Sequence, residues 1–353
     1  MNEFPGIQLF SKDVCLDMNV PTFLVAEVSA NHNQSIERAE AIIRAAAEAG
    51  ASAVKLQTYT ADTMTIPCDN EYFRIKGTLW DSRTLHELYQ EAYTPWEWHP
   101  RLMQLANDLG MGCFSTPFDA TAVDFLESLN VPCHKVASFE LVDIPLLKKI
   151  AATNKPVIMS TGMASLAEID EAVRTLRENG TKDLVLLKCT SAYPAPPEEI
   201  HLRTIPHLAE AFGCPAGLSD HTLGSAVAVA SVALGAMVVE KHFTLARADG
   251  GPDSAFSMEP DEFKQMAHDI RAVEKALGRV NYSLTLKEKE SVVFRRSLFV
   301  VKDMKAGEFF TKENLRSIRP GYGLHTRHLE HVLGRRAIKD IAQGTPVDWN
   351  LIR

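Results

Sequence analysis

Eight short apolar runs alternate with helical stretches between about residues 23 and 243, and this alternation constrains the fold more than any other feature. In chain order, the runs are FLVAEVS, AVKLQT, GCFSTPF, CHKVAS, PVIMST, LVLLKCTS, AGLSDHT and MVVEKHF. Each run is almost continuously hydrophobic and then turns polar, as expected of strands that are buried on both faces. Eight such βα units within about 250 residues predict an α/β fold of the (β/α)8 TIM-barrel type.

The stretches between the runs have helical patterns with recognisable ends. SIERAEAIIRAAAEAG and SLAEIDEAVRTLRENG begin at Ser35 and Ser165, which we predict as N-caps, and each stretch ends at a glycine. An open, doubly wound sheet is the alternative arrangement. No GxGxxG motif follows any of the eight runs, so the closed barrel is favoured.

The connection over residues 59–95 is much longer than the others and is rich in aromatic and polar residues. We predict Thr94, Pro95 and Glu97 as the N-cap, N1 and N3 positions of the helix that follows. The insertion falls on the face where barrels build their sites, so we expect a loop that covers the substrate. The alternative is a surface excursion without a function.

The C-terminal part of the chain has a different character and contains an internal repeat. Residues 301–316 read VKDMKAGEFFTKENLR and residues 338–353 read IKDIAQGTPVDWNLIR, so Lys, Asp, Gly and a final Arg recur at the same positions. Two β-turn-β units with Gly at the turn predict a compact, pseudo-symmetric β-rich module. We therefore expect a barrel over 1–280, a linker over 281–290 and a small β-rich domain over 291–353.

Charge and composition exclude several classes of function. The net charge of −8 argues against a nucleic-acid partner, because phosphate contacts need concentrated Lys and Arg. The most apolar window, residues 226–239, is too short for a membrane span, so we expect no membrane partner. The first residues show no basic segment followed by an apolar run, which predicts a cytoplasmic protein without a secretory signal. Six scattered cysteines without a CxxC pair indicate reduced thiols.

Polar residues end each of the eight runs, at the face where TIM barrels place their active sites. They are Glu27, Asn31, His32, Lys55, Gln57, Ser115, Thr116, Lys135, Ser138, Glu140, Ser160, Thr161, Thr190, Ser191, Tyr193, Ser219, Asp220, His221, Glu240, Lys241 and His242. Lys55 and Lys135 lie among many hydroxyls. This combination predicts a site for a carboxylate and a phosphate, rather than isolated structural ion pairs.

Two histidines and three carboxylates add further chemistry to this face. His221 and His242 end adjacent strands, so their rings can meet on one Mn²⁺, Mg²⁺ or Co²⁺ ion that acts as a Lewis acid on a carbonyl. Glu27 and Glu140 either bind sugar hydroxyls or move protons, and the sequence leaves both roles open. Asp253, in a glycine-rich loop, is either a third carboxylate of the site or a turn cap.

Taken together, these strings resemble the sialic acid synthase family. AEVSANHN, VKLQT, FSTPF, KVAS, STGM, the SDHT segment, EKHFTL and GPD follow one another in order over nearly the whole chain. The resemblance implies that the C-terminal module is an antifreeze-like (SAF, β-clip) domain. Within the family, GTLWD…TPWEWH and EKHFTLARADGGPDSAFS look most like the pseudaminic acid synthases. Ala30, Ser191 and Ser254 depart from the pattern usual in N-acetylneuraminate synthases, which weakens N-acetylmannosamine as the acceptor.

The resemblance implies a transferase that condenses phosphoenolpyruvate with an N-acetylated amino-sugar, here 2,4-diacetamido-2,4,6-trideoxy-L-altrose, by C–O cleavage. Phosphoenolpyruvate would be held by Lys55, Thr116, Lys135, Ser138, Ser160, Ser191 and Ser219. The acceptor sugar would be held by Glu27, Gln57, Tyr193, Asp253 and Arg319. Glu27, Glu140, Lys55, Lys135 and His242 would take part in catalysis, and Arg319 would act across a domain-swapped homodimer.

Three other functions stay open at this stage. An N-acetylneuraminate or legionaminate synthase would use the same site with another N-acetylated hexose. A Schiff-base aldolase would need one desolvated lysine and no phosphate cradle. A non-catalytic protein that binds sugar or ice would have no reason to gather polar residues at the strand ends.

Overall fold

The structure, a computed structural model, describes residues 7–8, 15–16, 20–77, 79–81 and 83–353. The chain divides into two compact units, Met1–Gly278 and Arg279–Arg353. The predicted linker, residues 281–290, falls at the start of the second unit, where helix α11 (Leu286–Ser291) forms.

The first unit is a closed barrel of eight parallel strands, which confirms the predicted TIM barrel. Neighbouring strands follow the order β10-β3-β4-β5-β6-β7-β8-β9, so each strand pairs with the next in sequence and the last closes on the first. The strands are β3 (Phe23–Glu27), β4 (Ala53–Thr58), β5 (Gly112–Pro117), β6 (His134–Val136), β7 (Val157–Ser160), β8 (Leu184–Cys189), β9 (Ala216–Asp220) and β10 (Val238–His242). All eight predicted runs form these strands.

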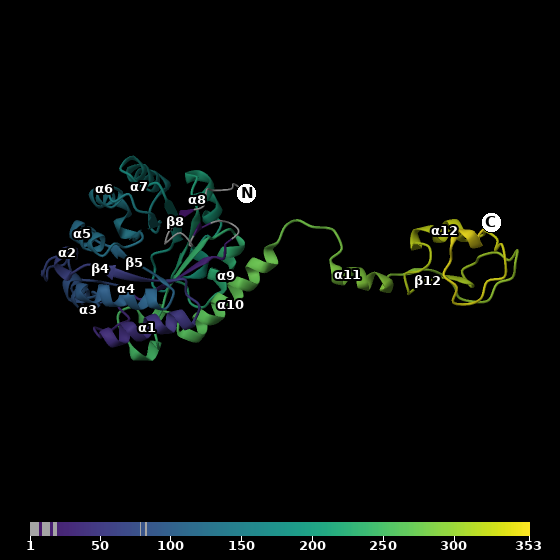
Figure 1. Ribbon diagram of the computed structural model, residues 1–353, viewed down its shortest axis with the longest axis horizontal. Helices are drawn as coiled ribbons and strands as arrows, with labels where there is room; N and C mark the ends of the chain where they lie inside the picture. Colours follow the sequence, from purple (N-terminus) through teal and green to yellow (C-terminus); the bar gives the residue numbers. More distant parts are fainter. Residues whose placement is uncertain (1–6, 9–14, 17–19, 78, 82) are drawn as a thin grey trace. The chain divides into compact units, whose positions relative to one another are not determined.

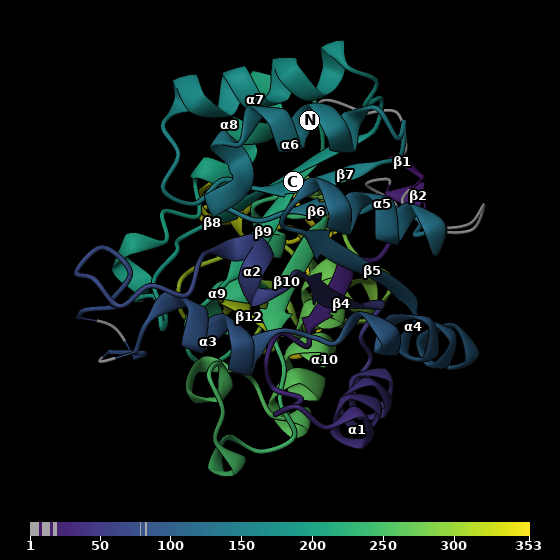
Figure 2. The ribbon, with the colours of Figure 1, turned by 90° about the vertical axis from the view of Figure 1, so that its left-hand side faces the viewer.

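Helices surround the strands, as Figures 1 and 2 show. One helix follows each strand before the next begins: α1 (Ile36–Glu48), α4 (His99–Asp108), α5 (Ala120–Ser128), α6 (Ile144–Ala151), α7 (Leu166–Glu178), α8 (Thr204–Phe212), α9 (Ala226–Ala233) and α10 (Pro260–Leu277). The insertion adds two short helices, α2 (Ala61–Met64) and α3 (Leu85–Ala92). The indole of Trp96 donates to the Tyr59 carbonyl at 3.1 Å and so ties the two ends of the insertion together.

The predicted helix starts are confirmed at two places and wrong at a third. The Ser35 hydroxyl accepts from the Arg38 N–H, and Ser165 forms a full capping box at α7. Thr94 does not cap a helix. A 3-10 turn, η1 (Trp96–Trp98), comes first and α4 begins only at His99. The Thr94 hydroxyl instead lies 3.2 Å from the His32 ring, so a tertiary contact outcompetes the local capping signal.

The side chains of each strand alternate between two environments. Phe23, Val25, Phe114, Ile158 and Leu187 belong to a cluster that fills the barrel interior. Their strand neighbours pack in two larger clusters with residues of the surrounding helices. Because alternate residues of a strand face opposite sides, the inward row of β3 continues from Phe23 and Val25 to Glu27. The apolar plug therefore gives way to a polar layer at the carboxyl ends of the strands.

The second unit pairs the two sequence repeats with each other. Strands β11 (Ser297–Val300) and β12 (Leu315–Ile318) are antiparallel, and their Val300–Leu315 pair has its counterpart in the Ala337–Ile352 bridge. Met304 and Ile341, which occupy the same position in the two copies, exchange both backbone hydrogen bonds at 2.8 and 2.9 Å.

Each repeat also caps the turn of the other. The Asp303 carboxylate accepts from the Gln343 N–H at 2.7 Å, and the Asp340 carboxylate accepts from the Ala306 N–H at 2.8 Å. Around these turns, Leu298, Phe310, Val332 and Val347 belong to a separate apolar core. The predicted pseudo-symmetric β module is confirmed.

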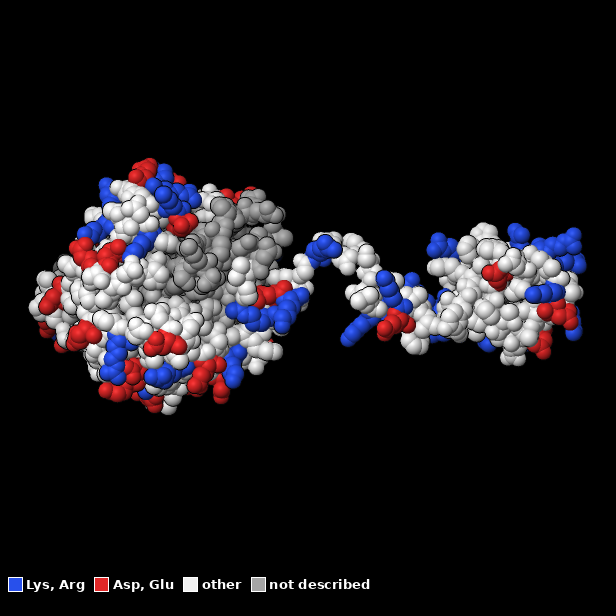
Figure 3. All heavy atoms as spheres, in the orientation of Figure 1, with Lys and Arg blue, Asp and Glu red and all other residues white. Residues whose placement is uncertain are grey.

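Three further features concern membrane spans, thiols and surface charge. None of the helices in the described residues is long and apolar enough to cross a membrane. Cys68, Cys113, Cys133, Cys189 and Cys214 are free thiols, while the side chain of Cys15 and the first six residues lie outside the described residues. On the face shown in Figure 3, acidic and basic side chains are interspersed over the barrel helices.

Candidate active site

Two buried lysines stand at the centre of the polar layer. The ammonium of Lys55, on β4, lies 2.7 Å from a Glu27 carboxylate oxygen, 3.5 Å from Glu240 and 3.4 Å from the Thr116 hydroxyl. The register explains this meeting, because β3 and β4 pair Glu27 with Lys55 directly. Glu240 also accepts from the Ser219 hydroxyl at 2.9 Å. Lys55, Glu27 and Glu240 are each no more than 5% exposed.

Lys135, on β6, contributes the second positive charge. Its ammonium donates to the Ser160 hydroxyl at 2.6 Å and to the Val136 carbonyl at 2.9 Å, and it is 1% exposed. Neither partner carries a charge. Burial lowers the pKa of Lys135 to about 8, and the charge of Lys55 acts in the same direction, although Glu240 opposes both. The ammonium is therefore suited to an incoming anion.

Small residues extend this cradle towards β8. The Ser138 hydroxyl lies 3.1 Å from the Gly162 N–H, and a Cβ at Gly162 would collide with the hydroxyls of both Ser191 and Ser138. The loops after β6, β7 and β8 therefore bring two hydroxyls and a backbone donor to one place. Such a group of neutral donors suits phosphate or carboxylate oxygens.

The carboxylates of the site differ in their tendency to hold a proton. Burial raises the pKa of Glu27 well above its usual range, and Glu240 adds to this effect while Lys55 opposes it. Although burial opposes it, the charges of Lys135 and Lys55 hold the pKa of Glu240 below its usual range. Glu27 therefore takes up a proton more readily than Glu240. Burial also raises the pKa of Glu140, after β6, to about 7, and one of its oxygens has no hydrogen-bond partner.

His221 and His242 lie side by side, with ring centroids 5.4 Å apart. The Nδ1 of His221 lies 2.9 Å from the Thr190 carbonyl, which places a hydrogen on this nitrogen, so Nε2 is the nitrogen left for a metal ion. Although burial opposes it, the neighbouring Cys189 raises the pKa of His221. Nδ1 of His242 is buried and has no partner. Burial, reinforced by His221, lowers the pKa of His242 well below its usual range, so this imidazole is neutral.

These two rings fit a divalent metal ion, because they lie side by side and Nδ1 of His242 is buried without a hydrogen-bond partner. The described residues hold no group of three or more His, Cys, Asp or Glu side chains that could bind a metal, so an ion here would rest on the two histidines alone. A two-histidine site leaves coordination positions open for substrate oxygens, as a catalytic rather than a structural ion requires.

Aromatic side chains border the histidines. The Tyr193 ring lies 4.4 Å from that of His221 and 5.1 Å from that of Phe256, which itself lies 4.9 Å from His242. Asp253 accepts hydrogen bonds from the Ser29 hydroxyl and, at 3.4 Å, from the Ala30 N–H, so both readings of this residue, site carboxylate and loop anchor, are compatible with its position.

The remaining predicted residues fall into two groups. Gln57 follows Lys55 by two positions on β4 and therefore belongs to the same inward row. Arg319 is exposed in the second unit, just after β12.

Glu240 is a member of the cluster to which the sequence pattern assigned no role. Its position at a strand end was visible, but its ion pair with Lys55 depends on the closure of β10 onto β3, which brings the last strand beside the first. A prediction that paired first and last strands would have found it.

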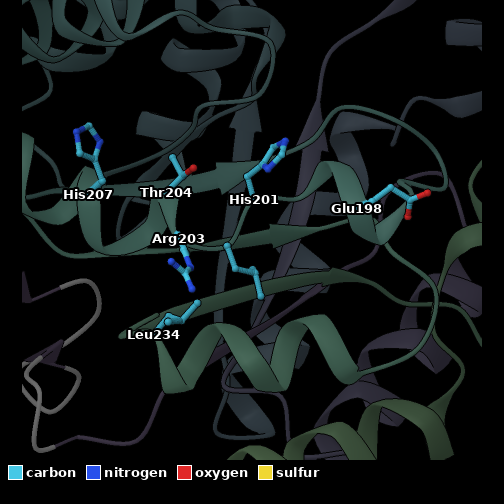
Figure 4. Close-up of a pocket in the computed structure, with 7 residues that line it drawn as sticks. Glu198, His201, Arg203, Thr204, His207 and Leu234 are labelled. Carbon is cyan, nitrogen blue, oxygen red and sulfur yellow. The ribbon is translucent and has the colours of Figure 1, made fainter.

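A surface hollow of about 620 Å³ lies away from this cluster (Figure 4). It is lined by Glu198, His201, Leu202, Arg203, Thr204, His207 and Leu234, from the loop before α8, α8 itself and the end of α9. These side chains are exposed or half-buried, and none belongs to the strand-end set. Buried charge, rather than the size of a surface hollow, therefore identifies the site.

Comparison with known proteins agrees with the geometry. Residues 42–282 match the NeuB family and residues 295–353 match the SAF domain. A pseudaminic acid synthase of Helicobacter pylori is 45% identical over 93% of this chain and 96% of its own. An N,N'-diacetyllegionaminic acid synthase of Campylobacter jejuni is 38% identical over 90% of this chain and 96% of its own.

Solved structures give the same result. The N-acetylneuraminic acid synthetase of Leptospira borgpetersenii superposes with a TM-score of 0.73 at 28% identity, over 82% of this chain and 96% of its own. The two family matches together span the barrel and the C-terminal module, with the candidate site inside the first. By fold, strand-end residues and sequence, the chain belongs to the NeuB family of sialic acid synthases and ends in a SAF domain.

Proposed function

We propose that the protein condenses phosphoenolpyruvate with 2,4-diacetamido-2,4,6-trideoxy-L-altrose and water to give pseudaminic acid and phosphate. The enzyme is thus a phosphoenolpyruvate-dependent transferase of the pseudaminic acid synthase type. The observation that carries the proposal is the pair of buried ammonium groups, Lys55 and Lys135, at the strand ends of a chain with a net charge of −8. The similarity to the pseudaminic acid synthase supports the choice of acceptor.

Phosphoenolpyruvate is a trianion at its highest charge, and the site offers it two kinds of partner. Lys55 and Lys135 supply charge, and hydroxyls from five strand ends supply directed hydrogen bonds. The hydroxyl residues proposed to bind it are Thr116, Ser138, Ser160, Ser191 and Ser219. Because burial raises the pKa of Glu27, this carboxyl takes up a proton more readily than an exposed one, which weakens its repulsion of the incoming carboxylate.

The acceptor binds with its aldehyde towards His221 and His242, which would hold Mn²⁺, Mg²⁺ or Co²⁺. Such an ion, when bound, supplies Lewis-acid polarisation of the aldehyde oxygen. Gln57, Tyr193, Asp253 and Glu27 orient the rest of the sugar. C3 of phosphoenolpyruvate then forms a bond with the aldehyde carbon as its C2–C3 double bond opens. The aldehyde C=O becomes an alcohol by taking up a proton, and C2 is left as an oxocarbenium.

Glu140 is proposed to take a proton from the water that adds to C2 of phosphoenolpyruvate. Its raised pKa, about 7, places it close to working pH, where a general base is most effective. The tetrahedral intermediate then loses phosphate by cleavage of its C–O bond. Water oxygen therefore enters the sugar and the bridging oxygen leaves with phosphate.

One assay tests the reaction and the acceptor together. Phosphate release with phosphoenolpyruvate is measured for the diacetamido-trideoxy altrose, for a diacetamido sugar of the legionaminate type and for N-acetylmannosamine. We expect the altrose to give the highest kcat/KM, and a higher value for either competitor would overturn the assignment. In ¹⁸O-labelled water, released phosphate should carry no label, since label there means P–O cleavage.

The metal proposal has a separate test. Mn²⁺ binding to metal-free protein is followed by calorimetry, and His221→Ala and His242→Ala should each abolish the binding isotherm. The exposed His201→Ala serves as the matched control and should bind like the wild type. Unchanged Mn²⁺ affinity in either site variant would contradict the two-histidine site.

Borohydride with substrate should trap no adduct, in contrast to a Schiff-base aldolase.

We further propose that Arg319 completes the site of a partner subunit in a homodimer. A planar guanidinium suits the carbonyl of an N-acetyl group, and the small C-terminal unit is joined to the barrel by a charged segment, which favours exchange between subunits. Arg319→Ala should weaken acceptor binding and spare phosphoenolpyruvate binding.

A mixing experiment distinguishes exchange from action within one chain. Arg319→Ala and His242→Ala are co-expressed, each inactive alone. If Arg319 acts across subunits, random pairing gives mixed dimers with one intact site and restores roughly a quarter of wild-type activity. If it acts within its own chain, every site carries one lesion and verified mixed dimers stay inactive.

A further inference from the structure

The insertion carries a hairpin whose tip reaches the candidate site. The Ile75 N–H donates to the Arg83 carbonyl at 2.9 Å and the Leu85 N–H donates to the Phe73 carbonyl at 2.8 Å, so the segment folds back on itself. Trp80 lies in the loop that the Ile75–Arg83 hydrogen bond closes. Trp80 is half-buried.

Trp80 joins the hairpin to two other parts of the barrel. Its indole N–H donates to the Pro252 carbonyl at 2.9 Å, in the loop after β10 and next to Asp253. Its ring centroid lies 5.9 Å from that of Tyr193, in the loop after β8. Tyr193 in turn packs against His221 and Phe256, so Trp80 is one aromatic ring further from the histidines than Tyr193.

We propose that Trp80 is a specificity-determining residue that recognises the apolar end of the acceptor sugar, its C6 methyl group. This inference rests on the proposed function, in which the aldehyde at C1 lies towards His221 and His242. The opposite end of the open-chain sugar then lies beside Tyr193 and Trp80. A 6-deoxy sugar presents a methyl group there, and other hexoses present a hydroxyl.

The chemistry of the indole makes this distinction. An indole has a single donor and no acceptor, and the N–H of Trp80 is already held by Pro252. The rest of the ring offers carbon surface, which packs well against a methyl group. A C6 hydroxyl in the same place loses its water without gaining a partner, which is unfavourable. We expect discrimination of about 10- to 100-fold in kcat/KM, as for other small groups in apolar pockets.

The test compares acceptors that differ only at C6. Steady-state kinetics are measured with the 6-deoxy diacetamido altrose and with its 6-hydroxy counterpart, for the wild type, Trp80→Ala and Trp80→Phe. The wild type should prefer the 6-deoxy sugar. Trp80→Ala should lower kcat/KM for that sugar by about 10-fold or more and bring the two acceptors close to equality. Trp80→Phe keeps a carbon surface and should retain most of the preference.

Controls separate recognition from loss of structure. Tyr72→Ala changes an aromatic residue of the same insertion that is 81% exposed, and it should leave the ratio between the acceptors unchanged. KM for phosphoenolpyruvate should be the same in all variants. An equal loss for both acceptors in Trp80→Ala, or an unchanged ratio, overturns the inference.

A second pair of sugars keeps this result independent of the proposed acceptor. N-acetylmannosamine and its 6-deoxy counterpart are assayed with the same variants. If the wild type uses this pair and rejects the diacetamido sugars, the proposed function is wrong, and the ratio within the pair still decides the role of Trp80.

Discussion

The ionisable residues of the barrel form a cluster whose charges are incompletely matched. Lys55 and Lys135 are both buried, and Lys55 is paired with Glu27 and Glu240, while Lys135 is bonded only to neutral groups. Lys135 therefore has no direct carboxylate partner in a setting with little water. An anion that fits the strand ends supplies the missing negative charge, which is why burial here indicates binding and not only structure.

Lys135 makes phosphoenolpyruvate capture dependent on pH. With a pKa of about 8 it is charged below that pH and neutral above it. We expect log(kcat/KM) for phosphoenolpyruvate to fall with a slope of about −1 above pH 8, because this ratio reports the free enzyme. Lys135→Met should lower kcat/KM and remove the inflection. A profile that keeps its inflection in this variant would show that another group titrates.

The buried Glu140 carboxyl should lower the free energy of unfolding at neutral and alkaline pH. Its pKa rises from 4.5 to about 7 on folding, because burial disfavours the ionised form. The resulting loss of stability is complete above pH 7 and disappears as pH falls to 4.5. Glu140→Gln should therefore raise the free energy of unfolding at pH 8 by about 1–3 kcal/mol, with no gain at pH 4.5.

Urea unfolding at both pH values measures this difference, and activity should fall in the same variant. The matched control is Glu171→Gln, an exposed position on α7, where we expect a change within about 0.5 kcal/mol at either pH. A stabilisation that is the same at pH 8 and pH 4.5 would mean that the charge of Glu140 is not its cause.

At the scale of the strands, a buried ion pair between Lys241 and Asp220 holds the ends of β9 and β10 together. The Lys241 ammonium donates to the Asp220 carboxylate at 2.7 Å and to the Thr222 carbonyl at 2.5 Å, and Asp220 also accepts from the Thr222 N–H and hydroxyl at 2.9 Å. Asp220 and Lys241 each precede one of the two histidines in sequence. The pair thus fixes the strand ends from which His221 and His242 project.

Lys241→Met should destabilise the barrel strongly, because it leaves the buried Asp220 carboxylate without its charge partner. We expect a loss of about 3–5 kcal/mol in the free energy of unfolding. Lys305→Met, which breaks the exposed ion pair with Asp340, should have a much smaller effect, because water screens exposed charges. Chemical denaturation of both variants makes the comparison, and equal small losses would contradict a structural role for the buried pair.

The strands were predictable from sequence because a parallel strand buried on both faces has a distinct pattern, and all eight runs follow it. Ser35 and Ser165 were predictable as caps because their signals are local. Thr94 was not, because the hydroxyl binds His32, a residue far away in sequence. The same reason explains Glu240: its role depends on strand pairing, which periodicity does not report. Lys55 and Lys135 were found because a charged residue in an apolar run is rare enough to be informative.

At the scale of the whole molecule, the two units have separate apolar cores. The core of the second unit includes Leu298, Val300, Phe310, Val332 and Val347, and it is made entirely from residues of that unit. We therefore expect residues 279–353 expressed alone to unfold in a single cooperative thermal transition. A non-cooperative melt of this fragment would mean that the unit needs the barrel in order to fold.

The crosswise pairing of the two repeats in that unit has a consequence for assembly. Copies of one motif that complete each other can in principle do so between chains as well as within one. The connection over residues 317–337 keeps each copy at an effective concentration in the millimolar range with respect to the other, far above the concentration of a second chain in most cells. Closure within the chain therefore wins, and the module is protected from chain-to-chain polymerisation through its own repeats.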